Sequence, residues 1–176
     1  MGIYQEMLVR YAVLIVLGLF DLAVFYAIFT PLTVYPVFKI LSTIDETTFL
    51  LAPNIISLKD FYFELVPACI AGAAYYFLCI LNLTTPMPLK KRVKSLGFLL
   101  GAFLGVNILR ILIFIWLAVV GFQYFDVTHR FVWYVGSTIF VVALWFMQVW
   151  LFKIKKIPVY SDLRGIVTFM RVRKKR

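Results

Sequence analysis

Histidine, cysteine and acidic side chains are scarce in this chain of 176 residues, which has one histidine, two cysteines and eight aspartates and glutamates. Two cysteines are too few for a disulfide framework, and with a single histidine they cannot build a cysteine-histidine metal cage. The sequence also has no phosphate-binding loop and no H-E-x-x-H motif of zinc proteases. These absences exclude several enzyme classes, and we expect no metal and no cofactor.

Apolar residues, by contrast, are abundant. They make up 64% of the sequence, and aromatic residues make up 18%, which is well above the content of soluble domains. The chain is therefore predicted to be an integral membrane protein. Much of its net charge of +10 comes from a basic tail at residues 153–176, after the last apolar segment. That position indicates a membrane-surface anchor, and we expect no nucleic-acid partner.

Four apolar segments are long enough to cross the hydrocarbon core, which takes about 20 residues of helix. We predict an all-α membrane domain over residues 1–152, with about four transmembrane helices. One further interfacial or re-entrant helix is expected between Pro31 and Ile44, where the apolar run is short and interrupted. The spans are predicted at residues 11–29, 65–83, 96–120 and 131–152.

Loop charges set the predicted orientation, because arginine and lysine concentrate in cytoplasmic loops. The basic loop at residues 90–94 and the basic tail fall on one side, and the acidic loop at residues 45–64 falls on the other. Both termini are therefore predicted to be cytoplasmic in a multi-pass protein of the plasma membrane. Within the outer loop, residues 54–58 and 61–63 favour extended structure and predict a short hairpin.

Arg110 lies inside the apolar run of the third predicted span. A charge at that depth costs roughly 2.5–3.5 kcal/mol on insertion scales, so such residues usually face a partner or a functional site. Asp21 in the first span is a candidate partner for a buried pair. Asn107, one turn before Arg110, is expected to form an interhelical hydrogen bond, and Gly101 with Gly105 predicts close helix packing.

Depth along the predicted helices brings three reactive residues together. At 1.5 Å per residue, Cys69 and Arg110 each lie about 21 Å above the inner ends of their spans. His129, in the predicted outer loop before the fourth span, lies at or above the outer surface. A guanidinium favours a thiolate and can bind an oxyanion, and a histidine can pass a proton to a leaving amine. The trio predicts a nucleophilic site for acyl transfer.

Three short motifs carry this pattern: Pro67-Ala68-Cys69, Asn107-Ile108-Leu109-Arg110, and His129 before the last span. In order and spacing they resemble the catalytic pattern of the exosortase and archaeosortase family of membrane transpeptidases. The resemblance covers roughly residues 50–151. It implies that Cys69, Arg110 and His129 form the active site, with Arg130 as an alternative third member.

The resemblance also implies a sortase-like cysteine transpeptidase or protease that acts on the outer face of the membrane. Its substrates would be exported proteins with a C-terminal sorting signal, made of a recognition motif, a transmembrane helix and a basic tail. Cleavage would leave a thioester on Cys69, and an acceptor, with a membrane lipid as one candidate, would release it. A second interpretation is a non-enzymatic assembly or transport subunit in which Arg110 and Asp21 form a buried pair.

Overall fold

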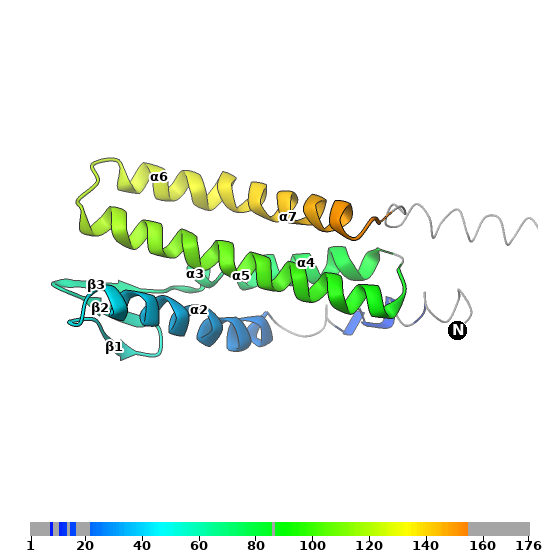
Figure 1. Cartoon of the computed structure of the whole chain (residues 1–176), viewed down its shortest axis with the longest axis horizontal. Helices are drawn as coiled ribbons and strands as arrows, with labels where there is room; N and C mark the ends of the chain where they lie inside the picture. Colours follow the sequence, from blue (N-terminus) through cyan, green and yellow to red (C-terminus); the bar gives the residue numbers. More distant parts are fainter. Residues whose placement is uncertain (1–7, 9–10, 14, 17–21, 86, 155–176) are drawn as a thin grey trace, which may run out of the picture.

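The computed structural model describes residues 8, 11–13, 15–16, 22–85 and 87–154. Most of this part of the chain is helical, and a small antiparallel sheet lies between the first two long helices in the sequence (Figure 1). The elements are α2 (Ala23–Ile44), β1 (Phe49–Ala52), β2 (Ile55–Leu58), β3 (Phe61–Glu64), α3 (Pro67–Ile70), α4 (Gly72–Thr84), α5 (Leu89–Val119), α6 (Phe125–Phe131), η1 (Val132–Gly136) and α7 (Ser137–Leu151).

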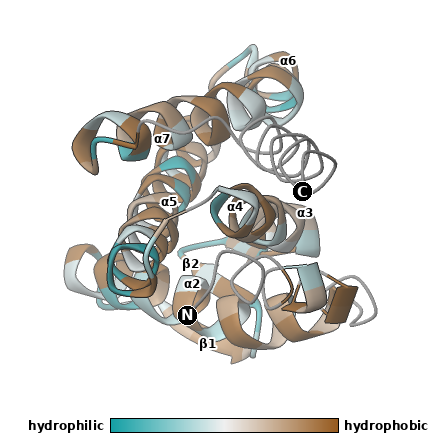
Figure 2. Cartoon of the chain, turned by 90° about the vertical axis from the view of Figure 1, so that its right-hand side faces the viewer, coloured by the Kyte–Doolittle hydropathy of each residue, from teal (hydrophilic) through white to brown (hydrophobic). Residues whose placement is uncertain are grey.

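Four stretches of helix are long and apolar enough to cross a membrane, as predicted. They are Ala23–Ile44, Pro67–Thr84, Leu89–Val119 and Phe125–Leu151. Large apolar side chains such as Leu109, Trp116 and Phe146 are more than half exposed, and Figure 2 shows that hydrophobic residues occur along all the long helices. Contact with lipid requires such an exterior, so the chain has the architecture of a multi-pass membrane protein.

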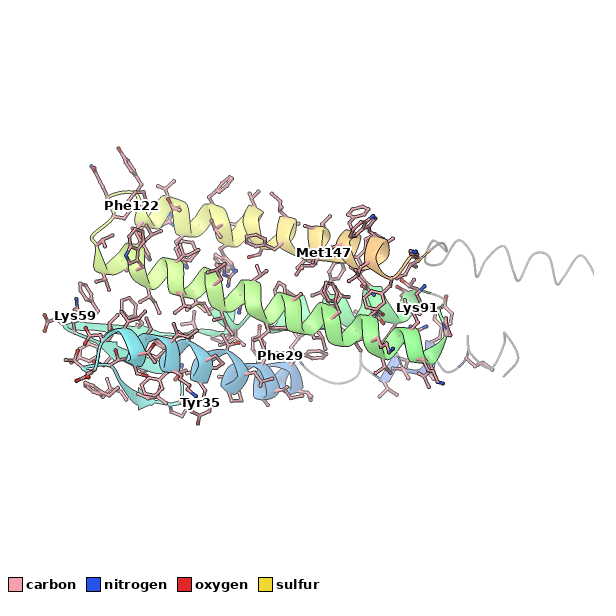
Figure 3. All side chains as sticks on the ribbon, viewed as in Figure 1. Phe29, Tyr35, Lys59, Lys91, Phe122 and Met147 are labelled. Carbon is pink, nitrogen blue, oxygen red and sulfur yellow. The ribbon has the colours of Figure 1, made fainter. Side chains whose placement is uncertain are left out.

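Lysines mark both ends of the molecule. Lys91 lies at one end of the long axis, near the α4–α5 connection, and Lys59 lies at the other, in the β2–β3 turn (Figure 3). The structure thus separates the basic loop from the acidic loop along the helix axes, as a membrane-spanning arrangement requires. Most of the basic tail, residues 155–176, lies outside the described residues. The side of the membrane that each end of the molecule faces stays a prediction.

Helix α2 differs from its prediction. We expected a span that ends at Phe29 and a separate interfacial helix after Pro31, but α2 runs unbroken from Ala23 to Ile44 through Pro31 and Pro36. Buried residues recur every fourth position from Phe29 to Leu41 and form one face against α4 and α5. Membrane helices tolerate proline because neighbouring groups satisfy the freed carbonyls, so packing overrides the local signal.

The second span is not the single helix that was predicted. Helix α3 ends at Ile70, Ala71 adopts the left-handed conformation with φ of 60°, and α4 begins at Gly72. A Cβ at position 72 would lie 2.8 Å from the Tyr26 ring, so α2 packs directly on this corner. Because the helix breaks directly after Cys69 and Ile70, their carbonyl groups lose helical partners.

The fourth span begins at Phe125 rather than at Phe131. Helix α6 continues through the π-helical turn η1 into α7, so His129 and Arg130 lie in a helix and not in the predicted loop. Their polarity suggested a loop, but α6 has Asp126 in its first turn and both basic residues in its last. The negative charge of Asp126 is favourable in the first turn because of the helix dipole.

Helix α5 also begins before its predicted start, at Leu89, and so includes the basic cluster. Arg92 near its N-terminus is buried. Its guanidinium donates four hydrogen bonds of 2.9 to 3.4 Å to carbonyl oxygens at the end of α4 and in the following loop, those of Asn82, Leu83, Thr85 and Met87. This arginine joins the two helices by capping the end of α4.

Gly101 and Gly105, in the middle of α5, do not pack closely against another described helix. Apart from the adjoining backbone of α5 itself, a Cβ at either position would meet no described atom within 4 Å. The predicted small-residue contact is therefore wrong for the described part of the chain. The buried face of α5 runs instead through larger residues, including Leu99, Phe103, Asn107 and Ile111.

The predicted hairpin at residues 54–58 and 61–63 is confirmed as β2 and β3, and a third strand, β1, joins them. The strand order is β1-β2-β3, and both pairs are antiparallel. The central strand has the buried residues Ile56 and Leu58, and Lys59 takes a positive φ of 53° in the turn to β3. The sheet lies beside the C-terminal part of α2, and β3 leads directly toward α3 (Figure 1).

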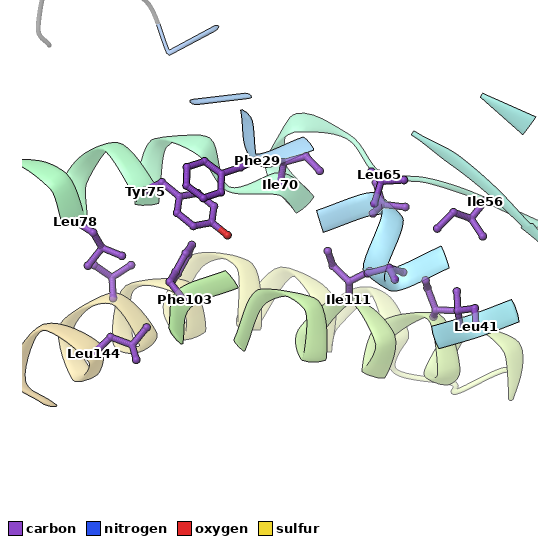
Figure 4. Packing of buried hydrophobic residues seen from close by; sticks show 14 of the residues in the cluster. Phe29, Leu41, Ile56, Leu65, Ile70, Tyr75, Leu78, Phe103, Ile111 and Leu144 are labelled. Carbon is purple, nitrogen blue, oxygen red and sulfur yellow. The ribbon is translucent and has the colours of Figure 1, made fainter. Parts of the chain in front are cut away.

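An aromatic cluster holds α2, α4 and α5 together. The ring of Tyr75 stacks on Phe29 with 3.5 Å between centroids, and Phe103 meets Tyr75 edge-on at 4.8 Å (Figure 4). Such pairs add about 0.5–1.5 kcal/mol each beyond the area they bury. Tyr75 is one turn after Ala71, so this core also fixes the helix break in space.

Candidate active site

Asn107 satisfies the backbone at the end of α3. Its Nδ2 atom donates hydrogen bonds to the carbonyl oxygens of Cys69, at 2.9 Å, and Ile70, at 3.4 Å. The side chain is almost completely buried. Its amide therefore donates to carbonyl groups that have lost their helical N–H partners and that water does not reach in an apolar setting. The predicted interhelical hydrogen bond of Asn107 is confirmed.

Arg110 lies one turn further along α5 and connects α3 to α7. Nη2 donates to the Cys69 carbonyl oxygen at 3.3 Å, and Nη1 donates to Ser137 Oγ at 2.8 Å. Ser137 donates in turn to the carbonyl oxygen of Val132 at 3.3 Å. The first contact confirms that Cys69 and Arg110 lie at the same level. A guanidinium has five N–H groups, so Arg110 can bind a ligand as well.

Two cavities lie beside these groups, and both are lined by Cys69, Arg110 and His129. The larger, of about 220 Å³, reaches β3, and we name it the sheet-side cavity. The smaller, of about 190 Å³, lies toward η1, and we name it the helix-side cavity. The structure thus brings the three predicted residues, from α3, α5 and α6, around a shared space with mostly apolar walls.

Aromatic rings hold His129 at the cavity wall. Its imidazole stacks on Phe125 at 5.7 Å, with an interplanar angle of 4°, and meets Phe114 edge-on at 4.9 Å. The side chain is half-buried. Its ring nitrogens make no hydrogen bond to any described residue, so they are available to exchange a proton with a ligand.

The remaining sequence candidates do not join this arrangement. Arg130 follows His129 in α6, but its side chain is exposed and lines neither cavity. Asp21 lies outside the described residues, so its pairing with Arg110 stays a prediction. Cys79, the second cysteine, is buried in α4 and also lines neither cavity.

Two residues at the site were not predicted. Ser137 binds Arg110 from the start of α7, and Glu64 at the end of β3 lines the sheet-side cavity. Ser137 follows His129 by about two helical turns, so the two residues lie on a similar face of one helix. The predicted start of the fourth span at Phe131 placed His129 outside that helix, so the sequence did not indicate this relation. Glu64 is the last acidic residue before Cys69, and it was assigned only to the outer loop.

Within the described residues, no group of three or more histidine, cysteine, aspartate and glutamate side chains is placed to hold a metal ion. No family model, no curated protein and no solved structure matches the chain. Its function is therefore inferred from the site. In acyl transfer a thiol can act as the nucleophile, an imidazole as its base and a guanidinium as a donor to the oxyanion.

Proposed function

We propose that the protein is a cysteine-dependent membrane transpeptidase or protease of the exosortase and archaeosortase type. One observation carries the proposal: Cys69, Arg110 and His129 come from three different helices and line the same two cavities. These residues are far apart in the sequence, and only the fold brings them together. Packing alone does not require such a convergence around open space.

The proposed reaction is an attack by the Cys69 thiolate on a peptide carbonyl. His129 accepts the thiol proton, the sulfur forms a bond to the carbonyl carbon, and a tetrahedral oxyanion results. When the C–N bond breaks, His129 gives the proton to the departing amine, and an acyl thioester stays on Cys69. An acceptor amine or hydroxyl, with a membrane lipid as one candidate, or water then attacks the thioester and restores the thiol.

Arg110 has two roles in this scheme. Its hydrogen bonds to Ser137 and to the Cys69 carbonyl hold the guanidinium in place, so it need not reorganise during the reaction. Its remaining N–H groups bind the oxyanion, and its charge favours the thiolate. Fixed donors aimed at developing charge usually give the largest single contribution to catalysis.

The proposed substrates are exported proteins with a C-terminal transmembrane helix and a basic tail. The basic α4–α5 connection lies at the opposite end of the bundle from the sheet (Figure 3). If that connection is cytoplasmic, the sheet and the cavities lie toward the outside. A substrate with the same orientation then presents the segment just outside its helix to Cys69.

Replacing Cys69 with alanine tests the proposal. In cells that carry the protein, full-length substrates should then keep their C-terminal helices and accumulate in the membrane. Cys79→Ala is the matched control, because it makes the same chemical change away from both cavities. Mass spectrometry of the membrane proteins would identify the substrates and the cleavage point. Normal processing in the Cys69→Ala strain would rule out the enzymatic function.

Thiol labelling of intact cells tests the orientation separately. In a Cys79→Ala background, a membrane-impermeant maleimide added from outside should modify Cys69. Labelling only after the cytoplasmic side is opened would contradict both the topology and the sorting reaction.

The structural alternative has an observation in its favour. Asn107 and Arg110 both bond to backbone carbonyls at the helix break, as residues in a non-enzymatic assembly or transport subunit would. That interpretation predicts that Cys69→Ala is silent, while Arg110→Leu harms only the amount of folded protein. The Cys69→Ala strain and its Cys79→Ala control therefore separate the two.

A further inference from the structure

Strand β3 is an edge of the sheet, and part of its backbone points away from β2. Leu65 N–H donates to the Asn54 carbonyl at 2.8 Å, directly after the paired residues Glu64 and Ile55. Antiparallel pairs alternate between hydrogen-bonded and non-hydrogen-bonded positions. Glu64 and Tyr62 are therefore the residues whose N–H and C=O groups face the free edge.

This edge is open in the described structure. Phe61 and Tyr62 are 44% and 70% exposed, and no described group bonds to the outward N–H and C=O of Tyr62. The outward carbonyl of Glu64 accepts only a local bond from Val66 N–H at 3.1 Å. An exposed edge is a template for another strand, and proteins usually block edges that have no use.

The open edge is continuous with the candidate active site. Phe63 and Glu64 of β3, with the following Leu65 and Val66, form one wall of the sheet-side cavity, and Cys69 and Arg110 lie on that cavity as well. A chain paired with β3 would therefore run into the space beside the thiol without a turn. No other strand of the sheet reaches either cavity.

We propose that the edge of β3 binds the peptide substrate as a fourth strand and guides its scissile bond to Cys69. This inference rests on the proposed function and names how that site holds its substrate. Because β3 runs from the outer turn toward Cys69, and the substrate runs from the outside into the membrane, the two strands are parallel. Main-chain hydrogen bonds to Tyr62 and Glu64 supply affinity, and the sheet-side cavity accepts a side chain.

Tyr62→Pro tests the proposal, because it removes an outward N–H without touching the bonds to β2. Proline is tolerated at such edge positions. Tyr62→Val is the matched control: it also removes the phenol but keeps the N–H. Both variants are made in the full-length, detergent-purified protein with the Cys79→Ala background, and melting temperatures confirm that they fold.

The measurement is the rate at which Cys69 is alkylated. One probe is acetyl-trialanyl chloromethyl ketone, in which the sulfur displaces chloride and forms a thioether; the other is iodoacetamide, which has no peptide arm. The ratio of the two rates reports binding of the arm. We expect Tyr62→Pro to lower this ratio about three- to tenfold, the effect of one backbone hydrogen bond, and Tyr62→Val to keep it. Equal ratios in the two variants would overturn the proposal.

N-methylation of the peptide probe tests the same pairing in a protein whose β3 strand is not mutated. Only alternate N–H groups of an extended peptide face its partner. Methylating one of two adjacent alanines should therefore lower the alkylation ratio, and methylating the other should not. Equal effects at both positions would overturn the proposal, and so would a dimer that dissociates in Tyr62→Pro without any change in the ratio.

These outcomes are distinct from failure of the proposed function. The alkylation ratio depends on a reactive Cys69 and on binding of the peptide arm, but it does not depend on processing of a protein substrate. If the alkylation ratio is unchanged in Tyr62→Pro but processing still depends on Cys69, the strand pairing is rejected and the proposed enzymatic function is retained. Processing that is unchanged in Cys69→Ala would reject the enzyme, whatever the ratio.

Discussion

Helix α5 carries two buried or half-buried arginines, one near its N-terminus and one further along, beside the end of α3, and the structure uses the two differently. Arg92 is 8% exposed and donates four hydrogen bonds to carbonyl oxygens around the end of α4. Arg110 donates one hydrogen bond to the end of α3 and one to Ser137, and it lines both cavities. Both arginines cap a helix end, but only Arg110 does so beside a thiol and an open space.

This difference separates a structural charge from a candidate catalytic one. Capping accounts for Arg92, because its donors are directed at carbonyls that need them. Capping accounts for Arg110 only in part, because Asn107 already bonds to the same Cys69 carbonyl at the shorter distance of 2.9 Å. An ionisable residue inside a membrane helix therefore indicates function when its surroundings leave room for a ligand.

Arg110→Gln should give the largest effect on processing. The amide keeps some hydrogen bonding but removes the charge, so we expect processing to fall about 10²- to 10³-fold, as when an oxyanion donor is lost. The rate of substrate cleavage in purified membranes measures it, with the melting temperature as the control for folding. A variant that is folded and within threefold of the original rate would place Arg110 beside Arg92 as a purely structural residue.

Arg92→Leu should instead lower stability. Four carbonyl groups lose their donor, and we expect the free energy of unfolding to fall by about 3 kcal/mol, since water reaches this end of the bundle in part. Thermal unfolding in detergent measures the loss. Processing per folded molecule should stay within about twofold of the original. A loss of activity as deep as that of Arg110→Gln, with stability unchanged, would reverse the comparison.

Local sequence signals predicted the parts of the fold that depend on local patterns. Apolar length gave four candidate spans, and β-favouring residues gave the β2–β3 hairpin. Helical rise within the predicted spans placed Cys69 and Arg110 level with each other, and their hydrogen bond confirms this. The roles of these residues in catalysis stay proposals.

Features that depend on packing were not predicted. The break at Ala71 has no local glycine or proline signal at the left-handed position, and it forms where Tyr26 packs on Gly72. Conversely, Pro31 suggested a break that α2 does not make, because its buried face continues through the proline. The contact between Ser137 and Arg110 was not predicted, because the start of the fourth helix was placed at Phe131 rather than at Phe125.

Ser137→Ala sharpens the comparison by loosening Arg110 without removing its charge. The variant loses the 2.8 Å hydrogen bond to the guanidinium, which is worth about 1 kcal/mol, so we expect kcat to fall about fivefold with little change in KM. Ser137→Thr keeps the hydroxyl and should restore most of the rate. Equal rates in the alanine and threonine variants would mean that Ser137 does not position Arg110.

Gly105→Ala should give the smallest effect, because position 105 lies between the two arginines on the exposed face of α5, where an added Cβ would contact no described neighbouring element. Alanine is a better helix former than glycine by about 0.5–1 kcal/mol, so stability should stay the same or rise slightly, and processing should not change. Gly72→Ala, which brings a Cβ to 2.8 Å from Tyr26, is the contrasting variant and should lower the melting temperature. A comparable drop in Gly105→Ala would show that position 105 also makes contacts, and that the sensitivity of α5 is not confined to its buried face.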